Sequence, residues 1–98
     1  MIARVLTGRG TLAQNEDIAR WFRDRLVPLA RRHRGFVGAY FLAGRDSDKG
    51  LAITLWETAE DERAWDESQA SGTLRDQRAR DHAAHGPTIE VYEVAVQA

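Results

Sequence analysis

The sequence predicts an α+β fold in which two helices cover one face of a four-stranded antiparallel sheet. Three observations predict it. Residues 51–65 pass from an apolar strand directly into a capped helix, residues 18–33 repeat apolar side chains at helical spacing, and three further short apolar stretches are bounded by glycine or polar turns. The predicted order of elements is strand, helix, strand, strand, helix, strand.

The first strand is predicted over residues 2–7 and ends before Gly8. Thr11 or Asn15 then caps the first helix, because the side-chain oxygen of either residue can accept a backbone N–H of the first turn. The helix places one apolar stripe toward the sheet, made of Ile18, Trp21, Phe22, Leu26, Leu29 and His33.

Pro28 lies inside this first helix. It lacks a backbone donor, so it should kink the helix near its middle or divide it there. Residues 31–34, Arg-Arg-His-Arg, crowd the last turn, where cations face the exposed carbonyl groups of the helix end. Gly35 is predicted to end the helix.

The next two strands are predicted to form an antiparallel hairpin. Residues 36–42 and residues 51–56 are apolar or nearly so at odd and even positions alike, and the polar segment 44–50 joins them. A strand with one face in water would carry polar side chains at every second position. Both strands are therefore predicted to be covered on both faces.

The second helix begins after Thr58, whose hydroxyl can accept the backbone N–H of Asp61. Three acidic residues in its first turn suit the positive end of the helix dipole. The helix is predicted over residues 59–70, and a weaker, highly charged helical pattern resumes over residues 74–84. The last strand is predicted over residues 88–96.

This β-α-β-β-α-β order is the ferredoxin-like arrangement, in which right-handed crossovers put both helices on one face of the sheet. The strands are apolar on both faces, so the face without helices would be a large apolar patch on an isolated chain. A second copy whose sheet packs on the first would cover it. We therefore expect a homodimer that forms through the sheet face.

The composition describes one small globular domain over residues 1–98. The 14 basic and 15 acidic residues give a net charge of −1, so no overall field attracts nucleic acid or an anionic membrane. The sequence has no cysteine, which excludes disulfides and thiolate sites and suits a reducing cytosol. No segment approaches the roughly 20 apolar residues of a membrane span. We expect a cytoplasmic protein.

Two short motifs resemble a known superfamily. Gly35-Phe36-Val37-Gly38 after the first helix, and residues 54–58, Thr-Leu-Trp-Glu-Thr, before the second, are similar to the dimeric α+β barrel proteins, and most of all to the antibiotic biosynthesis monooxygenase (ABM) domain family. The resemblance implies a homodimer with a cavity in each subunit between sheet and helices. In some members that cavity oxidises polycyclic phenols with molecular oxygen and no cofactor, and in others it binds and degrades haem.

The sequence departs from the haem-degrading members. They resemble this chain at Trp65, but they pair that tryptophan with an asparagine on the first strand and a histidine about three helical turns further along. The only asparagine of this chain is Asn15, the residue ten positions beyond Trp65 is Arg75, and the nearest histidine is His82. These differences argue against haem degradation, and no asparagine matches that of the cofactor-free oxygenases.

A cofactor-free oxygenase needs an apolar pocket for a flat phenol, a donor that stabilises the phenol anion, and room for oxygen. The candidate substrate-binding residues are Tyr40, Trp56, Trp65, His82 and Phe22, with Tyr40, His82 or Arg78 as polar contacts. Aromatic residues at strand and helix spacing are more often plain core, an interpretation favoured for Trp21, Phe22, Phe36 and Phe41. For Trp65 both interpretations, substrate-binding residue and plain core, stay open.

Other polar clusters favour structural explanations. His82 and His85 with Asp81 could hold a metal, but a solvated histidine pair at a helix end explains them better, and we expect no metal site and no cofactor. The basic residues 31–34 carry no interleaved aromatic residue, which argues against nucleic acid. Glu57 could act as a base, although anchoring of the strand-to-helix turn is favoured.

Two hypotheses follow. The first is an ABM-like monooxygenase that acts on a small aromatic or quinol substrate in a cavity between sheet and helices. The alternative is a non-catalytic dimeric module of the same fold, which binds a small apolar ligand or serves as a subunit. A closed pocket of roughly 300 Å³ or more with convergent polar groups favours the enzyme. A cavity filled by the rings of Trp56 and Trp65 favours the module.

Overall fold

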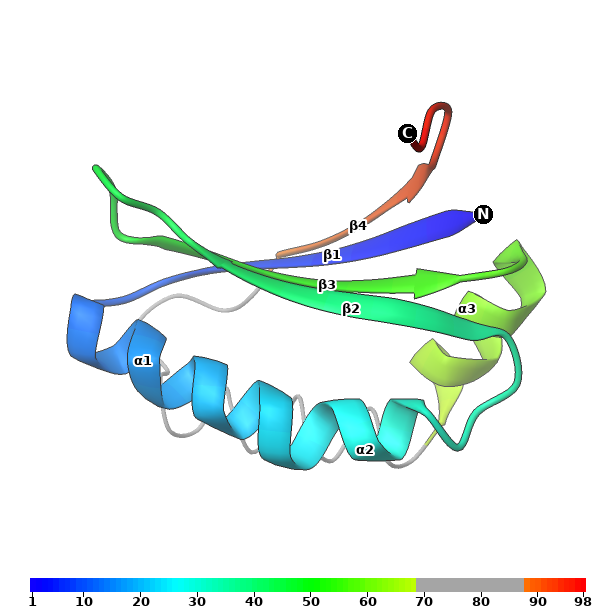
Figure 1. The fold of residues 1–98 in the computed structure, drawn as a ribbon, viewed down its shortest axis with the longest axis horizontal. Coiled ribbons are helices and arrows are strands. Elements are labelled where there is room, and N and C mark those ends of the chain that lie inside the picture. The colour runs from blue at the N-terminus through cyan, green and yellow to red at the C-terminus, as the bar shows by residue number, and fades with distance from the viewer. Residues whose placement is uncertain (69–87) are drawn as a thin grey trace.

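The structure is a computed structural model that describes residues 1–68 and 88–98. The elements follow the predicted order, with the first helix divided into three segments (Figure 1). In chain order they are β1 (Ile2–Arg9), α1 (Leu12–Trp21), the π-helical turn η1 (Phe22–Leu26), α2 (Val27–Ala30), β2 (Phe36–Ala43), β3 (Lys49–Trp56), α3 (Ala59–Glu67) and β4 (Thr88–Glu93). The helical pattern predicted over residues 74–84 lies outside the described residues.

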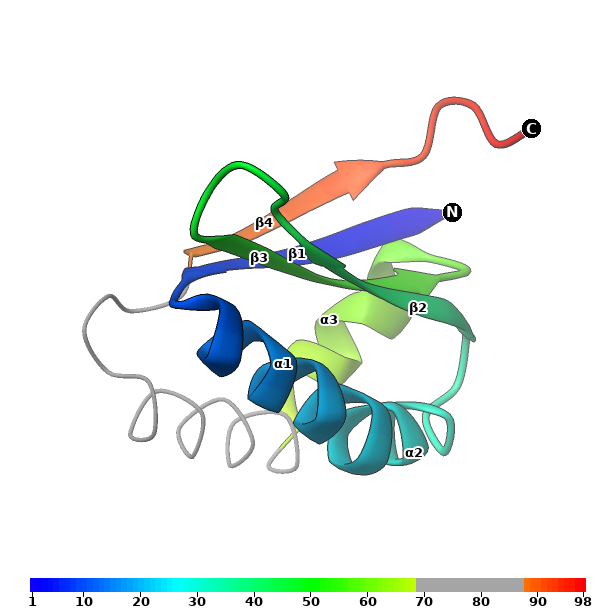
Figure 2. The same ribbon diagram turned by 60° about the vertical axis from the view of Figure 1, so that its left-hand side comes forward.

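The four strands form one antiparallel sheet in the order β2-β3-β1-β4. The α1-η1-α2 helix and α3 both lie on the same face of this sheet (Figure 2). This confirms the predicted ferredoxin-like α+β fold, in which β3 is a central strand and β2 and β4 are the edges. No helix within residues 1–68 and 88–98 is long and apolar enough to cross a bilayer.

The first helix starts at Thr11, one of the two predicted caps. The Thr11 hydroxyl accepts the backbone N–H of Gln14, and the Gln14 side chain accepts the Thr11 backbone N–H, which makes a complete capping box. Asn15 is not the cap, because it lies inside α1 and is buried. Strand β1 also runs further than predicted, since Gly8 and Arg9 still pair with β3.

Pro28 neither breaks the first helix nor separates it into two bodies (Figure 1). The turn before it widens instead, and the backbone N–H of Val27 donates to the carbonyl of Phe22, five residues back. A proline ring clashes with the carbonyl four residues before it, and a π-turn moves that carbonyl aside. The predicted division is therefore a local π-turn inside a continuous helix.

The first helix ends at Ala30, earlier than the predicted stop at Gly35, and residues 31–34 form turns instead of its last turn. Gly35 follows these turns with a φ of 84°, which other residues rarely adopt. A Cβ added at this position would overlap the side chain of Asp61 on α3. The Gly35 carbonyl accepts the backbone N–H of Glu57 at 2.8 Å. This close approach joins the start of β2 to the turn between β3 and α3.

The core lies between the sheet and the helices. Trp56 on β3 is fully buried, and its ring stacks on that of Trp65 from α3 with 5.7 Å between centroids. Phe36 packs edge-on against Trp56 at 5.6 Å. The even positions of β3 face the helices and are all buried, which places the odd positions on the opposite face.

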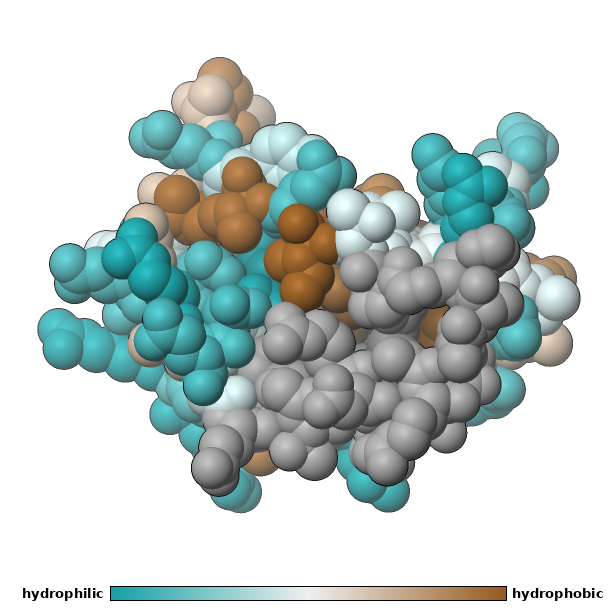
Figure 3. Space-filling view, turned by 180° about the vertical axis from the view of Figure 1, so that it is seen from behind, coloured by the Kyte–Doolittle hydropathy of each residue, from teal (hydrophilic) through white to brown (hydrophobic). Residues whose placement is uncertain are grey.

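That opposite face has no helix over it in the described chain (Figure 2). It carries Leu51, Ile53 and Leu55 of β3, each half-buried, and the more exposed Tyr40 and Leu42 of β2. The apolar character of both faces, predicted from the sequence, is thus present in the structure. Seen from behind, apolar side chains also reach the surface among polar ones (Figure 3).

Candidate functional site

The first hollow of the structure is a small inner cavity between the sheet and the helices. Its volume is about 30 Å³, close to the space that one water molecule occupies in the liquid. Four elements contribute to its wall: β1, the first helix, β3 and α3. The residues that matter for its chemistry are Arg4, Leu6, Trp21, Phe22, Thr54 and Trp65.

Arg4 places a positive charge beside this cavity. Arg4 and Leu6 are two positions apart in β1, so both side chains lie on the helix-facing side of the strand. Arg4 is only 6% exposed there. Its Nη1 donates to Glu62 Oε2 at 3.0 Å and to Asp66 Oδ1 at 2.6 Å, both on α3. The two carboxylates compensate a buried guanidinium that would otherwise be very costly.

Trp21 supplies a second donor. It lines the cavity, and its Nε1 is buried with no hydrogen-bond partner within residues 1–68 and 88–98. A buried N–H without an acceptor is costly, so such a group in a native fold needs an explanation. A ligand oxygen in the cavity would provide one.

Thr54 adds a hydroxyl to the same wall. It is 4% exposed, and its Oγ1 accepts the indole N–H of Trp56 at 3.0 Å. Because a hydroxyl carries one proton and two lone pairs, this bond leaves the Thr54 O–H able to donate. Arg4 and Thr54 are cross-strand neighbours in the β1–β3 register, which sets the two groups side by side.

Trp65 forms the aromatic wall and is itself held tightly. Its ring is stacked on Trp56 on one side and meets the ring of His33 edge-on at 5.0 Å. Only 2% of Trp65 is exposed. The two tryptophan rings occupy much of the space between sheet and α3, which accounts for the small volume of the cavity.

The predicted site residues do not all meet. Phe22 and Trp65 line the cavity, and Trp56 lies directly behind Trp65. Tyr40 does not belong to this group: it pairs with Ile53 across the sheet, points to the face without helices and is 59% exposed. A bulge at the start of β2 shifts its register, so strand alternation puts Tyr40 outside. His82 lies outside the described residues.

The three polar groups of the cavity wall belong to residues that were not predicted as site residues: Arg4, Trp21 and Thr54. A signal for Arg4 was present, since it occupies the same strand parity as the apolar Leu6 in the predicted first strand. A charge at such a position indicates either an edge or a buried partner. The sequence offered no comparable signal for Trp21, whose spacing is that of ordinary core.

The remaining candidates have structural roles where the structure describes them. The backbone N–H of Glu57 donates to Gly35, and its side chain is exposed, which supports the anchoring role. Residues 31–34 follow the end of α2, and His33 turns inward against Trp65. No group of three or more acidic, histidine or cysteine side chains is arranged for a metal in residues 1–68 and 88–98.

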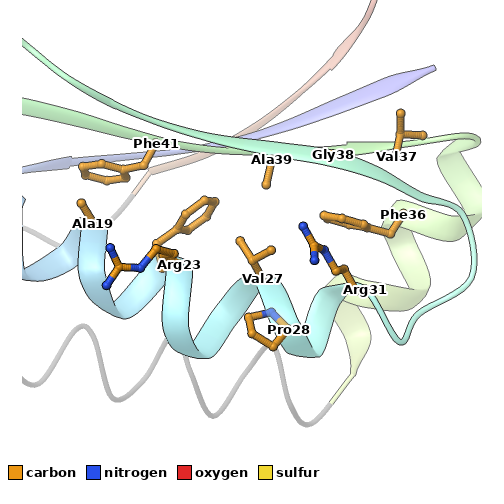
Figure 4. A pocket seen from close by; sticks show the side chains of 11 residues that line it. Ala19, Arg23, Val27, Pro28, Arg31, Phe36, Val37, Gly38, Ala39 and Phe41 are labelled. Atoms are coloured by element: carbon orange, nitrogen blue, oxygen red, sulfur yellow. The ribbon is translucent and has the colours of Figure 1, made fainter.

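The second hollow is an open groove of about 620 Å³ between the first helix and β2 (Figure 4). The helix contributes Ala19, Arg23, Val27 and Arg31, and the strand contributes Phe36, Ala39 and Phe41. Phe22 borders both hollows and separates the groove from the inner cavity. The groove lies along an edge strand, so one side is open to water.

Comparison with solved structures identifies the same fold in several proteins. A monooxygenase of Streptomyces coelicolor in complex with nanaomycin D has a TM-score of 0.83 and 17% identity, over 99% of this chain and 91% of that one. A Deinococcus radiodurans protein, assigned by name to the antibiotic biosynthesis monooxygenases, has a TM-score of 0.79 and 10% identity, over 100% of this chain and 96% of that one. The haem degrader MhuD of Mycobacterium tuberculosis, with two haems bound in its active site, has a TM-score of 0.73 and 18% identity, over 100% of this chain and 99% of that one.

These likenesses confirm the ABM resemblance at the level of the fold. No family model and no curated protein matches the sequence. Proteins with at least two different activities share this fold. The choice among activities therefore depends on the residues of the cavity.

Proposed function

We propose that this chain, which has the fold of the ABM proteins, is a monooxygenase that oxidises a small aromatic phenol or quinol with molecular oxygen and without a cofactor. The inner cavity is its site. The observation that carries the proposal is the buried indole N–H of Trp21, which has no acceptor among the described residues, in a cavity that the buried guanidinium of Arg4 also lines. Donors of this kind in a water-poor site stabilise an oxyanion.

The residues divide the work as follows. Trp21 Nε1 and the Arg4 guanidinium lower the free energy of the phenolate form of the substrate, from which electrons pass to oxygen most readily. Trp65 provides a flat wall for the ring, and Glu62 holds Arg4 in place. In the overall reaction one oxygen atom becomes a carbonyl on the activated ring carbon. The other leaves as water with the one hydrogen of that ring carbon and the hydrogen of the phenol O–H, so that the phenol becomes a quinone.

The Streptomyces coelicolor monooxygenase supports the choice of substrate class, because its structure contains nanaomycin D. The departures from the haem-degrading pattern at the first strand, where the described β1 has no asparagine, favour this class over haem. A cavity of about 30 Å³ cannot hold an aromatic ring in its present form. The proposal therefore requires side chains of the wall, Trp65 or Phe22 first, to move when substrate binds.

The second candidate is the non-catalytic module, and the same volume favours it. The stacked rings of Trp56 and Trp65 fill the space that an open substrate pocket would need. In this alternative the tryptophans are core, and the Arg4 cluster only ties β1 to α3. The two candidates differ in one measurable property, which is turnover.

Oxygen consumption with a panel of anthrone-type and quinol substrates tests the proposal. Trp21→Phe removes one N–H from the cavity and keeps an aromatic side chain, although a smaller one, while the matched control Tyr40→Phe removes one O–H from the opposite face of the sheet. We expect Trp21→Phe to lower kcat by about tenfold or more, as removal of an oxyanion donor does, and Tyr40→Phe to leave it unchanged. Turnover by none of the panel would support the module instead.

We also propose that the active form is a homodimer that joins two sheets through the face without helices. Tyr40, Leu42 and Val37 are between 43% and 59% exposed there, beside the row of Leu51, Ile53 and Leu55. A patch of this kind on one small chain is typical of an interface. Light scattering at micromolar concentration should give twice the chain mass, and Ile53→Glu should give a monomer.

A further inference from the structure

The groove between the first helix and β2 has a shape that the helix alone would not produce. Its helix side includes a series of residues spaced four apart, Ala19, Arg23, Val27 and Arg31, together with Phe22 and Pro28. Arg31 lies twelve residues after Ala19, whereas three turns of a regular α-helix take only about 10.8 residues. In a regular helix the excess of about 1.2 residues would rotate Arg31 away from the groove. The π-turn takes up about one extra residue and keeps the series in line.

The strand side of the groove is opened by the bulge in β2. Phe36 faces the helices opposite Trp56, and the next residue to do so is Ala39, opposite Thr54. Val37 points away from the helix (Figure 4), and Gly38 has no side chain. Two consecutive positions thus line the groove without a side chain that points toward the helix, and a gap remains between the side chains of Phe36 and Ala39.

Two aromatic rings and one aliphatic side chain border this gap. Phe36 stands at one end, and Phe41 at the other, where it packs on Phe22 with 6.0 Å between ring centroids. Val27 extends from the helix toward Ala39 between them (Figure 4). The volume of about 620 Å³ lies in the range of small-molecule sites.

The two arginines of the groove differ in their charge balance. Arg23 donates twice to the neighbouring Asp24 carboxylate, at 2.7 Å and 3.1 Å. This hydrogen-bonded pair lowers the pKa of Asp24 and raises the pKa of Arg23, so each neutralises the other. Arg31 has no ion pair in the part of the chain that the structure describes, and its side chain extends toward β2 beside Phe36 (Figure 4).

From this geometry we infer a second binding site that is distinct from the inner cavity. The groove binds a planar aromatic anion, with the ring between Val27 and the phenylalanine side chains and the anionic group on Arg31. An aryl carboxylate fits best, because the planar guanidinium pairs with a planar carboxylate through two parallel hydrogen bonds. The inference does not depend on the proposed oxygenase activity, since Phe22 separates the two hollows.

Isothermal titration calorimetry with naphthoate and its neutral analogue naphthamide tests this site. The variant is Arg31→Gln, and the matched control is Arg32→Gln, which removes another exposed charge, one residue further along, that does not line the groove. We expect naphthoate to bind the wild type at one site per chain. Arg31→Gln should weaken it by about tenfold or more, as loss of a charge-assisted pair does, and Arg32→Gln by no more than about twofold.

Naphthamide should bind more weakly than naphthoate to the wild type and equally to both variants. Equal loss of naphthoate binding in Arg31→Gln and Arg32→Gln would indicate general attraction to a basic surface and would overturn the inference. Binding that Arg31→Gln leaves intact but Trp21→Phe weakens would place the ligand in the inner cavity instead. The absence of naphthoate binding at millimolar concentration would also refute the site.

Discussion

The ion cluster of Arg4, Glu62 and Asp66 offers the sharpest test of how the cavity is held together. The Arg4 and Glu62 side chains are 7% and 10% exposed, whereas Asp66 is 41% exposed. Arg4→Met removes the cation and leaves the Glu62 carboxylate buried without its partner. Loss of one member of a buried pair costs about 3–5 kcal/mol of unfolding free energy.

The other variants of the cluster should lose less. Asp66→Asn removes a charge that water already reaches, so the expected loss is about 1 kcal/mol or less. The double variant Arg4→Met with Glu62→Leu removes both buried charges and replaces them with apolar groups of similar size. Its unfolding free energy should return to within about 1 kcal/mol of the wild type, because no buried charge is left unpaired.

Urea unfolding followed by tryptophan fluorescence measures these differences, since Trp56 and Trp65 lie in the core beside the cluster. All variants are compared at one protein concentration, because association would add to the apparent stability. The double variant keeps the test decisive when Arg4→Met alone does not fold. A loss below about 1 kcal/mol for Arg4→Met, or a double variant no more stable than the single one, would contradict the account of a buried, compensated charge.

Three further predictions concern the backbone and its caps, each measured by urea unfolding. Gly35→Ala should cost about 1–3 kcal/mol, because φ is positive there and the new Cβ meets Asp61, whereas Gly38→Ala, whose Cβ meets open space, should stay within about 0.5 kcal/mol. Thr11→Ala and Thr58→Ala should each cost about 1 kcal/mol through the lost N-cap, and replacement by Ser should restore most of it. Gly50→Ala should destabilise the chain, because its Cβ would lie 2.9 Å from Asn15 Oδ1 and 3.0 Å from Phe41; an unchanged midpoint would show that α1 moves freely over β3.

Local patterns in the sequence predicted the elements and their order. The capping residues Thr11 and Thr58 and the two-sided apolar pattern of β3 each act over a few residues. Such signals can be read without knowledge of distant contacts. For Pro28 the sequence predicted a kink or a division near the middle of the helix, and the structure has a π-turn there that separates α1 from α2. The local sequence did not specify a π-turn, because that choice depends on what packs against the helix.

The candidate site was predicted only in part. Trp65 and Phe22 were expected in the cavity and line it, whereas Tyr40 was expected there and lies on the other face. A bulge of one residue at the start of β2 decides that difference, and nothing in the local composition marks it.

The sequence by itself thus determined the ferredoxin-like order and the apolar nature of both sheet faces, because propensity, capping and periodicity act between near neighbours. Only the tertiary structure decided that Arg4 meets Glu62, 58 positions away, and that the indole of Trp21 is left without an acceptor among the described residues. Contacts between distant segments depend on register, crossover and packing together. The chemistry of the cavity depends on those contacts, and for that reason it could not be derived from the order of residues alone.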